Sequence, residues 1–214
     1  ILGVTLPELR HLAPILVAWA VSVVVMVGEK DLGSSLMFFT LVVVMLWVAT
    51  ERTSFLVMGI GLFVGGAVIA YNLFSHVQTR VEIWLNPWDQ YTERGYQPIQ
   101  ALFALANGGM TGTGLGIGDP GAIPAAHNDF IFAALGEELG LLGGVAILSA
   151  FVLLVGAGMR TALRAQRDFE KLLATGLTTI VAIQTFIIIG GVLRVVPLTG
   201  VTLPFMSYGG SSLV

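Results

Sequence analysis

Three carboxylates stand at the start of a long apolar stretch, where their types permit acid–base chemistry. Asp129 follows His127, and Glu137 and Glu138 come 8 and 9 residues after it, about 12–14 Å further along a helix. A positioned carboxylate can accept or donate a proton during a reaction. Asp129 equally fits the N-cap of the helix that follows.

Whether Glu137 and Glu138 are candidate functional residues depends on their depth in the membrane. Ionisable groups within a membrane indicate function, whereas at the interface they cost little. Adjacent helix positions differ by about 100°, so only one of Glu137 and Glu138 is expected to face an inner cavity.

Basic side chains that could bind an anion are few. Lys30 lies between Glu29 and Asp31, in a segment that is either a solvated turn or a contact for an anionic headgroup. Arg194 ends an apolar stretch, where it either snorkels to the interface or binds phosphate. Arg80 and Arg94 are the only basic residues between positions 80 and 129.

Other motifs add no known metal or nucleotide site. Residues 108–118 are rich in glycine, but they match neither the dinucleotide nor the Gly-Lys-Ser/Thr fingerprint. They predict a tightly turning loop in preference to a phosphate-binding nest. H-E-x-x-H, G-x-S-x-G and cysteine are all absent from the sequence, which excludes disulfides and thiolate zinc sites.

The elements that must position these residues are membrane helices. A spanning helix needs about 20 mostly apolar residues. The run 195–214 is uncharged, but its prolines and glycines predict a loop or a broken segment. We expect an all-α, polytopic transmembrane helix bundle with about five spans. The five charge-free runs that predict them are 11–28, 32–50, 53–79, 139–159 and 172–193.

Composition agrees with a membrane protein. Of the 214 residues, 56% are hydrophobic and 11% are charged, against about 25% charged in average chains. A net charge of -3 without a basic block excludes a nucleic-acid-binding domain. We expect residues 1–214 to be a single integral membrane domain and a fragment of a longer protein.

Basic residues predict the orientation in the membrane. The short segment 160–171 carries Arg160, Arg164, Arg167 and Lys171, which predicts a cytoplasmic position. Residues 80–129 then form a long extracytoplasmic loop. Long ordered loops are usually functional, so we expect the catalytic residues there.

Two features of this loop predict contact with the membrane surface. Ile99, Leu102, Phe103 and Ala106 recur at helical spacing and predict a short interfacial helix. The tryptophans of residues 84–88 fit either an aromatic belt or a surface for a lipid substrate.

Five sequence blocks, in the same order, resemble those of the SEDS family (shape, elongation, division and sporulation), which contains RodA, FtsW and SpoVE. Residues 193–200 are more similar to RodA-type than to FtsW-type members. Asn128 is a departure, since the family more often has Thr there. The blocks are Lys30-Asp-Leu-Gly-Ser-Ser35; Asn86-Pro-Trp88 with Gly95-Tyr-Gln97; Gly108-Gly109 with Gly112-x-Gly114-x-Gly116; His127-Asn-Asp-Phe-Ile-Phe132 with Gly136-Glu-Glu-Leu-Gly140; and Pro197-Leu-Thr-Gly200 with Leu203-Pro-Phe-Met-Ser-Tyr-Gly-Gly-Ser-Ser212.

The resemblance implies a SEDS fold of roughly ten spans and a peptidoglycan glycosyltransferase. Such an enzyme polymerises lipid II into glycan strands at the outer face of the bacterial cytoplasmic membrane. It serves cell wall biogenesis during elongation or division, with a class B penicillin-binding protein as partner. The resemblance implies that Asp129 is catalytic. The leaving pyrophosphate is expected to be neutralised by a divalent cation, Mg²⁺ or Mn²⁺, or instead by one of the basic residues Lys30, Arg80, Arg94 and Arg194. The expected substrate-binding residues are Lys30, Arg80, Arg94, Gln97, Glu137, Glu138, Arg194 and Ser207.

Two other functions fit the same composition. A lipid II flippase would need the membrane helices but no base at Asp129. A non-catalytic scaffold for a penicillin-binding protein would tolerate replacement of Asp129 but not of the helix surfaces. Glycan product from purified protein distinguishes the polymerase from both.

Overall fold

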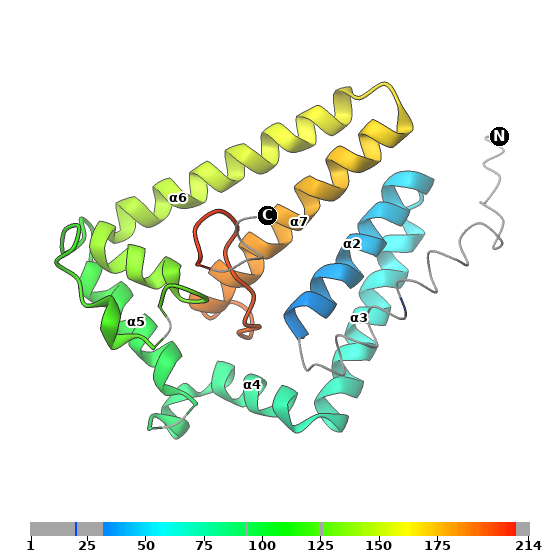
Figure 1. Cartoon of the computed structure of the whole chain (residues 1–214). Helices are drawn as coiled ribbons and strands as arrows, with labels where there is room; N and C mark the ends of the chain where they lie inside the picture. Colours follow the sequence, from blue (N-terminus) through cyan, green and yellow to red (C-terminus); the bar gives the residue numbers. More distant parts are fainter. Residues whose placement is uncertain (1–19, 21–31, 93, 125, 209–214) are drawn as a thin grey trace.

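A computed structural model describes residue 20 and residues 32–92, 94–124 and 126–208. Every regular element in these ranges is a helix, as the sequence predicts (Figure 1). The elements are α2 (Leu32–Thr50), α3 (Ser54–Leu73), α4 (Ser75–Leu85), η1 (Pro87–Gln90), α5 (Tyr96–Gly108), η2 (Pro120–Ala122), α6 (Ile131–Arg164) and α7 (Asp168–Val192).

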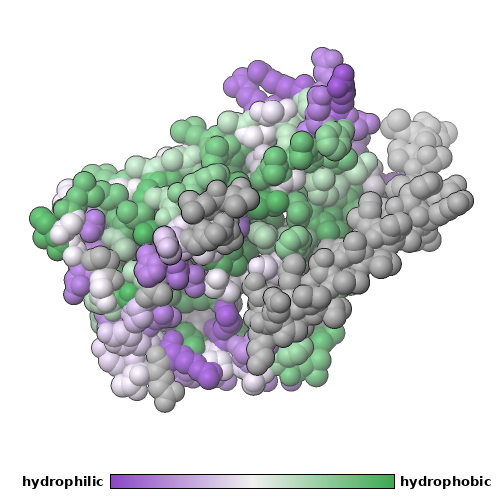
Figure 2. Space-filling model, viewed as in Figure 1, coloured by the Kyte–Doolittle hydropathy of each residue, from purple (hydrophilic) through white to green (hydrophobic). Residues whose placement is uncertain are grey.

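Four helices in the described part of the chain, α2, α3, α6 and α7, are long and apolar enough to cross a membrane. They confirm four of the five expected spans; the run 11–28 lies outside the described residues except for Ala20. The helices α6 and α7 lie side by side in opposite directions, and α2 packs against both α7 and α3 (Figure 1). Hydrophobic residues cover the middle of this bundle, and hydrophilic residues gather towards its ends (Figure 2).

The run 53–79 is not one helix. Phe74 adopts an extended backbone (φ -118°, ψ 113°) that ends α3, and α4 then runs crosswise below the bundle (Figure 1). The physical reason is polarity: His76, Gln78 and Arg80 follow this point, and such side chains are expensive in lipid. Much of the expected loop 80–129 is helical, because it contains the end of α4 and all of α5.

The predicted short helix exists as α5, and Ile99 of the predicted apolar set is fully buried. Small residues, Ala101, Ala104 and Gly108, face the core, while Phe103 and Ala106 are exposed. A Cβ on Gly108 would collide with the carbonyl oxygen of Gly136, so the two helix backbones are in direct contact. Close backbone approach through small residues is typical of membrane helices.

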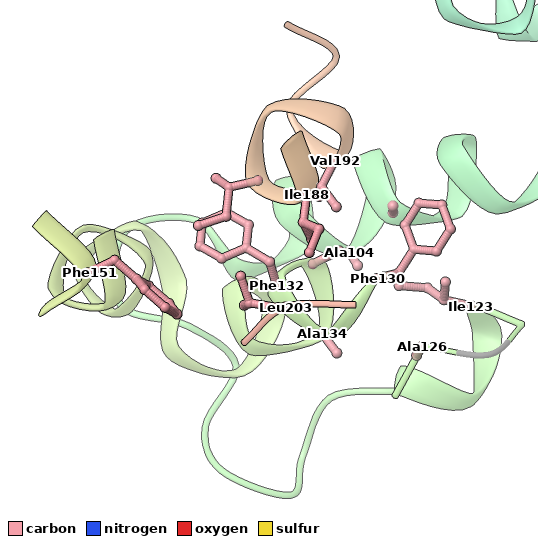
Figure 3. Close-up of a cluster of buried hydrophobic side chains, with 13 residues drawn as sticks. Ala104, Ile123, Ala126, Phe130, Phe132, Ala134, Phe151, Ile188, Val192 and Leu203 are labelled. Carbon is pink, nitrogen blue, oxygen red and sulfur yellow. The ribbon is translucent and has the colours of Figure 1, made fainter. Parts of the chain in front are cut away.

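The beginning of α6 is held by a buried hydrophobic cluster. Phe130 and Phe132 pack with Ala104 of α5, with Val192 of α7 and with Leu203 from the segment after α7 (Figure 3). The cluster therefore fixes the residues next to Asp129 against three other parts of the chain.

Candidate active site

Asp129 opens onto a cavity of about 230 Å³. The cavity collects side chains from α4, from the start of α5, from the start of α6 and from the segment after α7. Its charged lining is Asp129 with Arg80, Arg94 and Arg194. The structure thus brings together the predicted carboxylate and three of the four predicted basic residues.

Asp129 lies just before α6 and does not cap it. Phe130 occupies the N-cap position, and no side chain makes a capping hydrogen bond. Burial raises the pKa of the Asp129 carboxyl above its ordinary value, because removal from water penalises the charged form, and the nearby charge of Arg80 opposes this rise. A raised pKa suits a group that must accept a proton near neutral pH.

Arg80 approaches the site from the middle of α4. Its Nη1 donates a hydrogen bond of 2.7 Å to the carbonyl oxygen of Leu198. Between Arg80 and Asp129 stands Gly200, whose φ of 80° favours glycine. A Cβ there would lie 3.7 Å from Asp129 Oδ2 and 3.9 Å from Arg80 Nη2. Glycine leaves the space between guanidinium and carboxylate open.

Arg194 and Trp84 join the end of α7 to the end of α4. Arg194 Nη2 donates to the carbonyl oxygens of Trp84 and Leu85 at 2.7 and 3.1 Å. Trp84 Nε1 donates back to the carbonyl oxygen of Arg194 at 2.9 Å. Arg194 therefore satisfies the last carbonyls of α4, which a helix end leaves without partners. The side chain also lines the cavity, as the predicted phosphate-binding role requires.

Arg94 and Gln97 also line the cavity. Arg94 Nη1 donates to Thr79 Oγ1 at 3.3 Å, and Gln97 Nε2 donates to the carbonyl oxygen of Pro124 at 3.1 Å. Among the described residues, Arg80, Arg94 and Arg194 have no carboxylate within 4.0 Å. Three positive charges around one cavity suit an anionic ligand.

The two glutamates lie elsewhere. Glu137 is buried, with Oε2 lacking a hydrogen-bond partner, and it lies against Gly118 of the glycine loop (residues 109–118). Glu138 lines a second cavity, of about 530 Å³, together with His127. The spacing rule that only one of them would face a given cavity holds, but neither lines the Asp129 cavity.

Ser207 has contacts that fit a structural role. Its Oγ donates to the carbonyl oxygen of Asn128 at 2.7 Å and accepts the amide of Leu203 at 2.8 Å. Tyr208 also donates its amide to the carbonyl oxygen of His127. These bonds tie the segment after α7 to the residues before Asp129. Lys30 lies outside the described residues.

Trp84, Leu198 and Gly200 line the cavity and were not among the predicted site residues. The sequence does indicate Trp84 as a candidate, since its position near Asn86-Pro87 fits either an aromatic belt or a substrate surface. Trp88 fits the belt, because it is exposed and packs edge-on against Phe103 at 6.0 Å. Only the fold could reveal the contact of Arg80 with Leu198, which are 118 residues apart.

The cavity does not fit a metal ion held by the protein alone. Its charged lining is one carboxylate and three guanidinium groups, whereas Mg²⁺ takes carboxylates and other oxygen ligands. No group of three potential metal ligands occurs in the described ranges. The divalent cation stays an untested prediction.

Comparison with known proteins shows to which family the chain belongs. The family model for FtsW, RodA and SpoVE, described as "Cell cycle protein", matches residues 3–214. The peptidoglycan glycosyltransferase RodA of Mycobacterium tuberculosis H37Rv is 53% identical over 214 residues, which are 100% of this chain and 46% of that protein. A probable peptidoglycan glycosyltransferase FtsW of Geobacter metallireducens is 40% identical over 207 residues, 94% of this chain and 54% of that protein. The chain spans about half the length of these curated relatives.

A solved structure shares the fold. It is described as showing "Structural coordination of polymerization and crosslinking by a peptidoglycan synthase complex", and the match covers 99% of this chain and 60% of that chain, with a TM-score of 0.74 and 27% identity. The higher identity to RodA than to this FtsW relative agrees with the RodA-type resemblance of residues 193–200. With a family model matching nearly its whole length and four helices able to span a membrane, the chain is a multi-pass bacterial membrane protein that belongs to the FtsW/RodA/SpoVE family, the SEDS family that its sequence resembles.

Proposed function

We propose that the protein to which this chain corresponds is a peptidoglycan glycosyltransferase that polymerises lipid II at the outer face of the cytoplasmic membrane. The observation that carries the proposal is the cavity in which Asp129 stands among Arg80, Arg94 and Arg194. The reaction needs a base for a sugar hydroxyl and positive charge for a pyrophosphate, and both kinds of group line this one cavity. The names of the relatives, peptidoglycan glycosyltransferase RodA and FtsW, support the same reaction.

In the proposed reaction the 4-hydroxyl oxygen of the acceptor sugar attacks the anomeric carbon of the growing, lipid-linked glycan. Asp129 takes the hydroxyl proton as the new glycosidic bond forms. The bond between the anomeric carbon and the pyrophosphate oxygen breaks, and undecaprenyl pyrophosphate leaves with the bonding electron pair. A base of this kind contributes about 10²–10⁴-fold to a rate.

The arginines are proposed to stabilise the negative charge that develops on the leaving pyrophosphate. Positive groups held in place before the reaction act most strongly where water is excluded. Arg80 and Arg194 are held by hydrogen bonds to backbone carbonyl oxygens, so their positions do not depend on the substrate. Neither forms an ion pair within 4.0 Å with a carboxylate among the described residues.

We propose a class B penicillin-binding protein as the partner that cross-links the product. The match to a chain of a peptidoglycan synthase complex supports a working association of this kind. The partner and the lipid II substrate are both proposals for the longer protein, since the chain spans about half of its relatives.

The test is lipid II polymerisation by the full-length protein with its partner, comparing the wild type with Asp129→Ala and Asp129→Asn. Both variants should keep their fold, measured by monodisperse elution and thermal unfolding in detergent, and both should lose glycan product by about 10²-fold or more. Arg167→Gln is a matched control, since Arg167 lies at the α6–α7 turn, remote from Asp129, and should leave the product unchanged.

Two results would contradict the proposal. Equal product from wild type and Asp129→Ala would remove Asp129 as the base. Absence of product from folded wild type, with lipid II transport across vesicles intact, would favour the flippase instead.

A further inference from the structure

The helix α6 is interrupted at Gly140, and the glycine loop fills the interruption. Gly140 has φ 67° and ψ -168°, so the helical hydrogen-bond pattern fails there. The amides of Leu141 and Leu142 donate instead to the carbonyl oxygens of Gly109 and Met110, at 2.9 and 3.2 Å. In return, the amide of Thr113 donates to the carbonyl oxygen of Glu137 at 2.9 Å. The loop is therefore fixed at a known height along α6.

By length, this height corresponds to one boundary of the hydrocarbon core, and the orientation expected from the basic segment 160–171 makes it the outer one. Arg160 marks the polar end of the apolar part of α6. Residues 140–159 number 20 and span about 30 Å as a helix, which is the thickness of the hydrocarbon core. Gly140 thus lies near the outer surface of the hydrocarbon, and Met110, bonded to Leu142, lies just within it.

The glycine loop turns large apolar side chains away from the protein. Met110, Leu115 and Ile117, which we call the apolar tip, are 62%, 76% and 75% exposed. The loop follows α5 at the edge of the molecule where α5 and α6 meet (Figure 1). No charged residue occurs from 95 to 118. An uncharged loop that exposes three such side chains together is typical of an interaction site.

The surface around the apolar tip continues the lipid-facing surface of the bundle. Leu141 and Leu142, next to the tip, are 55% and 60% exposed, and Val152 further along α6 is exposed as well. Phe103 of α5 and Trp88 also expose an aromatic pair, which is frequent at membrane interfaces. The tip therefore lies next to exposed apolar residues of α6.

We propose that the apolar tip is immersed in the outer leaflet and anchors the glycine loop in lipid, beside the break in α6. The occupant is the acyl-chain region of the bilayer, and the proposal does not depend on the catalytic role of Asp129. Since the loop's amides cap the carbonyls before the break, the lipid contact holds the start of α6 at a fixed depth.

Fluorescence quenching in vesicles tests the proposal. The chain contains no cysteine, so Leu115→Cys and Ile117→Cys can be labelled singly with bimane in the full-length protein, after replacement of any cysteines elsewhere. The vesicles contain phosphatidylethanolamine and phosphatidylglycerol with acyl-chain-brominated phosphatidylcholine. Val152→Cys on α6 serves as the lipid-facing control, and Asp119→Cys, an exposed polar position two residues beyond Ile117, serves as the aqueous control.

The brominated lipid should quench positions 115 and 117 to a degree comparable with position 152, and aqueous iodide should quench only position 119. Iodide quenching at 115 and 117 as strong as at 119 would overturn the proposal. Protection of both positions from lipid and from iodide would also overturn it, because the tip would then be covered by protein. Two independent label positions keep the test valid if one variant fails to fold.

Discussion

Two opposing effects act on the single carboxyl group of Asp129. Burial disfavours its charged form and raises its pKa, while the positive charge of Arg80 favours that form and limits the rise. A base must be ionised to work, so the proposed polymerisation is expected to slow as the pH falls through this raised pKa. The acidic limb of the rate profile should therefore lie above the ordinary range of an aspartate.

Replacing Arg80 should move that limb. In Arg80→Gln the favourable charge is lost, so the pKa of Asp129 should rise further and the acidic limb of lipid II polymerisation should shift to higher pH. The measurement is the pH dependence of the polymerisation rate for wild type, Arg80→Gln and Arg167→Gln. Arg167 is exposed and lies beyond the other end of α6, so the acidic limb of the Arg167→Gln variant should match that of the wild type. If the acidic limb of the rate profile of Arg80→Gln is unchanged, Arg80 does not influence the pKa of the catalytic base.

The same shift has a consequence for stability. Above the raised pKa the folded protein carries a half-buried charge at Asp129, and the penalty for this charge disappears as the pH falls and the group takes up a proton. Asp129→Asn should therefore unfold at a higher temperature than wild type at neutral pH, with a gain that shrinks in acid. An N-cap would behave oppositely, since its loss costs about 0.5–2 kcal/mol.

Gly200 controls the space between Arg80 and Asp129. In Gly200→Ala the positive φ costs about 1–2 kcal/mol, and the added methyl group occupies the gap beside the carboxylate. Polymerisation at a temperature well below unfolding should fall by more than this loss of stability explains. Gly116→Ala is the matched control, because Gly116 also has a positive φ but its Cβ would meet nothing within 4 Å. An equal loss of activity in both variants would mean that backbone strain alone, and not the methyl group beside Asp129, causes the loss.

Among the elements, α6 departs most from its sequence pattern. The charge-free run 139–159 predicts a helix that starts near the membrane, yet α6 begins at Ile131 and is interrupted at Gly140. The apolar runs predict α2 and α7 well, because charge is excluded from lipid wherever the helix lies, while the run 53–79 extends beyond the end of α3 at Leu73. The break could not be predicted, since Gly140 is one of 27 glycines and the acceptors of the freed amides after it, Gly109 and Met110, lie about 30 residues earlier.

The break can be tested by adding one methyl group. A Cβ on Gly140 would collide with the amide nitrogen of Gly112 and lie 2.7 Å from the carbonyl carbon of Met110. Gly140→Ala should therefore destabilise the protein by more than the roughly 1–3 kcal/mol of backbone strain alone. Gly156→Ala, on the same helix with open space around its Cβ, should be neutral or slightly stabilising. Thermal unfolding in detergent compares the two, and similar stabilities would mean that the break is not required.

At the same scale, the candidate site was only partly predictable. Asp129 stands out by its place before an apolar run, and Arg80 and Arg94 by being the only bases in a long polar segment. What joins them is long-range packing: α4 turns crosswise at Phe74, and the end of α7 returns to α4 through Arg194 and Trp84. These contacts join segments that are far apart in the sequence, and neither the periodicity of apolar residues nor the distribution of charge predicts which segments pack together.

Viewed as a whole, the molecule has two different ends. The turn after α2 and the α6–α7 turn lie together, since Lys171 forms an ion pair with Glu51 at 3.6 Å. The Asp129 cavity lies at the opposite end of α6 and α7. The structure therefore separates the basic segment 160–171 from the cavity by the length of a membrane span.

This separation turns the orientation into a decisive prediction. Because short basic segments stay in the cytoplasm, residues 160–171 should be inside and the Asp129 cavity outside, where polymerisation of exported lipid II would take place. Single cysteines at the exposed positions Asp89 and Gln166 of the full-length protein can be labelled in intact cells with a membrane-impermeant maleimide. Asp89→Cys should react directly, and Gln166→Cys only after permeabilisation. The reverse pattern would put the carboxylate and its arginines on the cytoplasmic side, and no arrangement of the cavity could then serve glycan synthesis outside the cell.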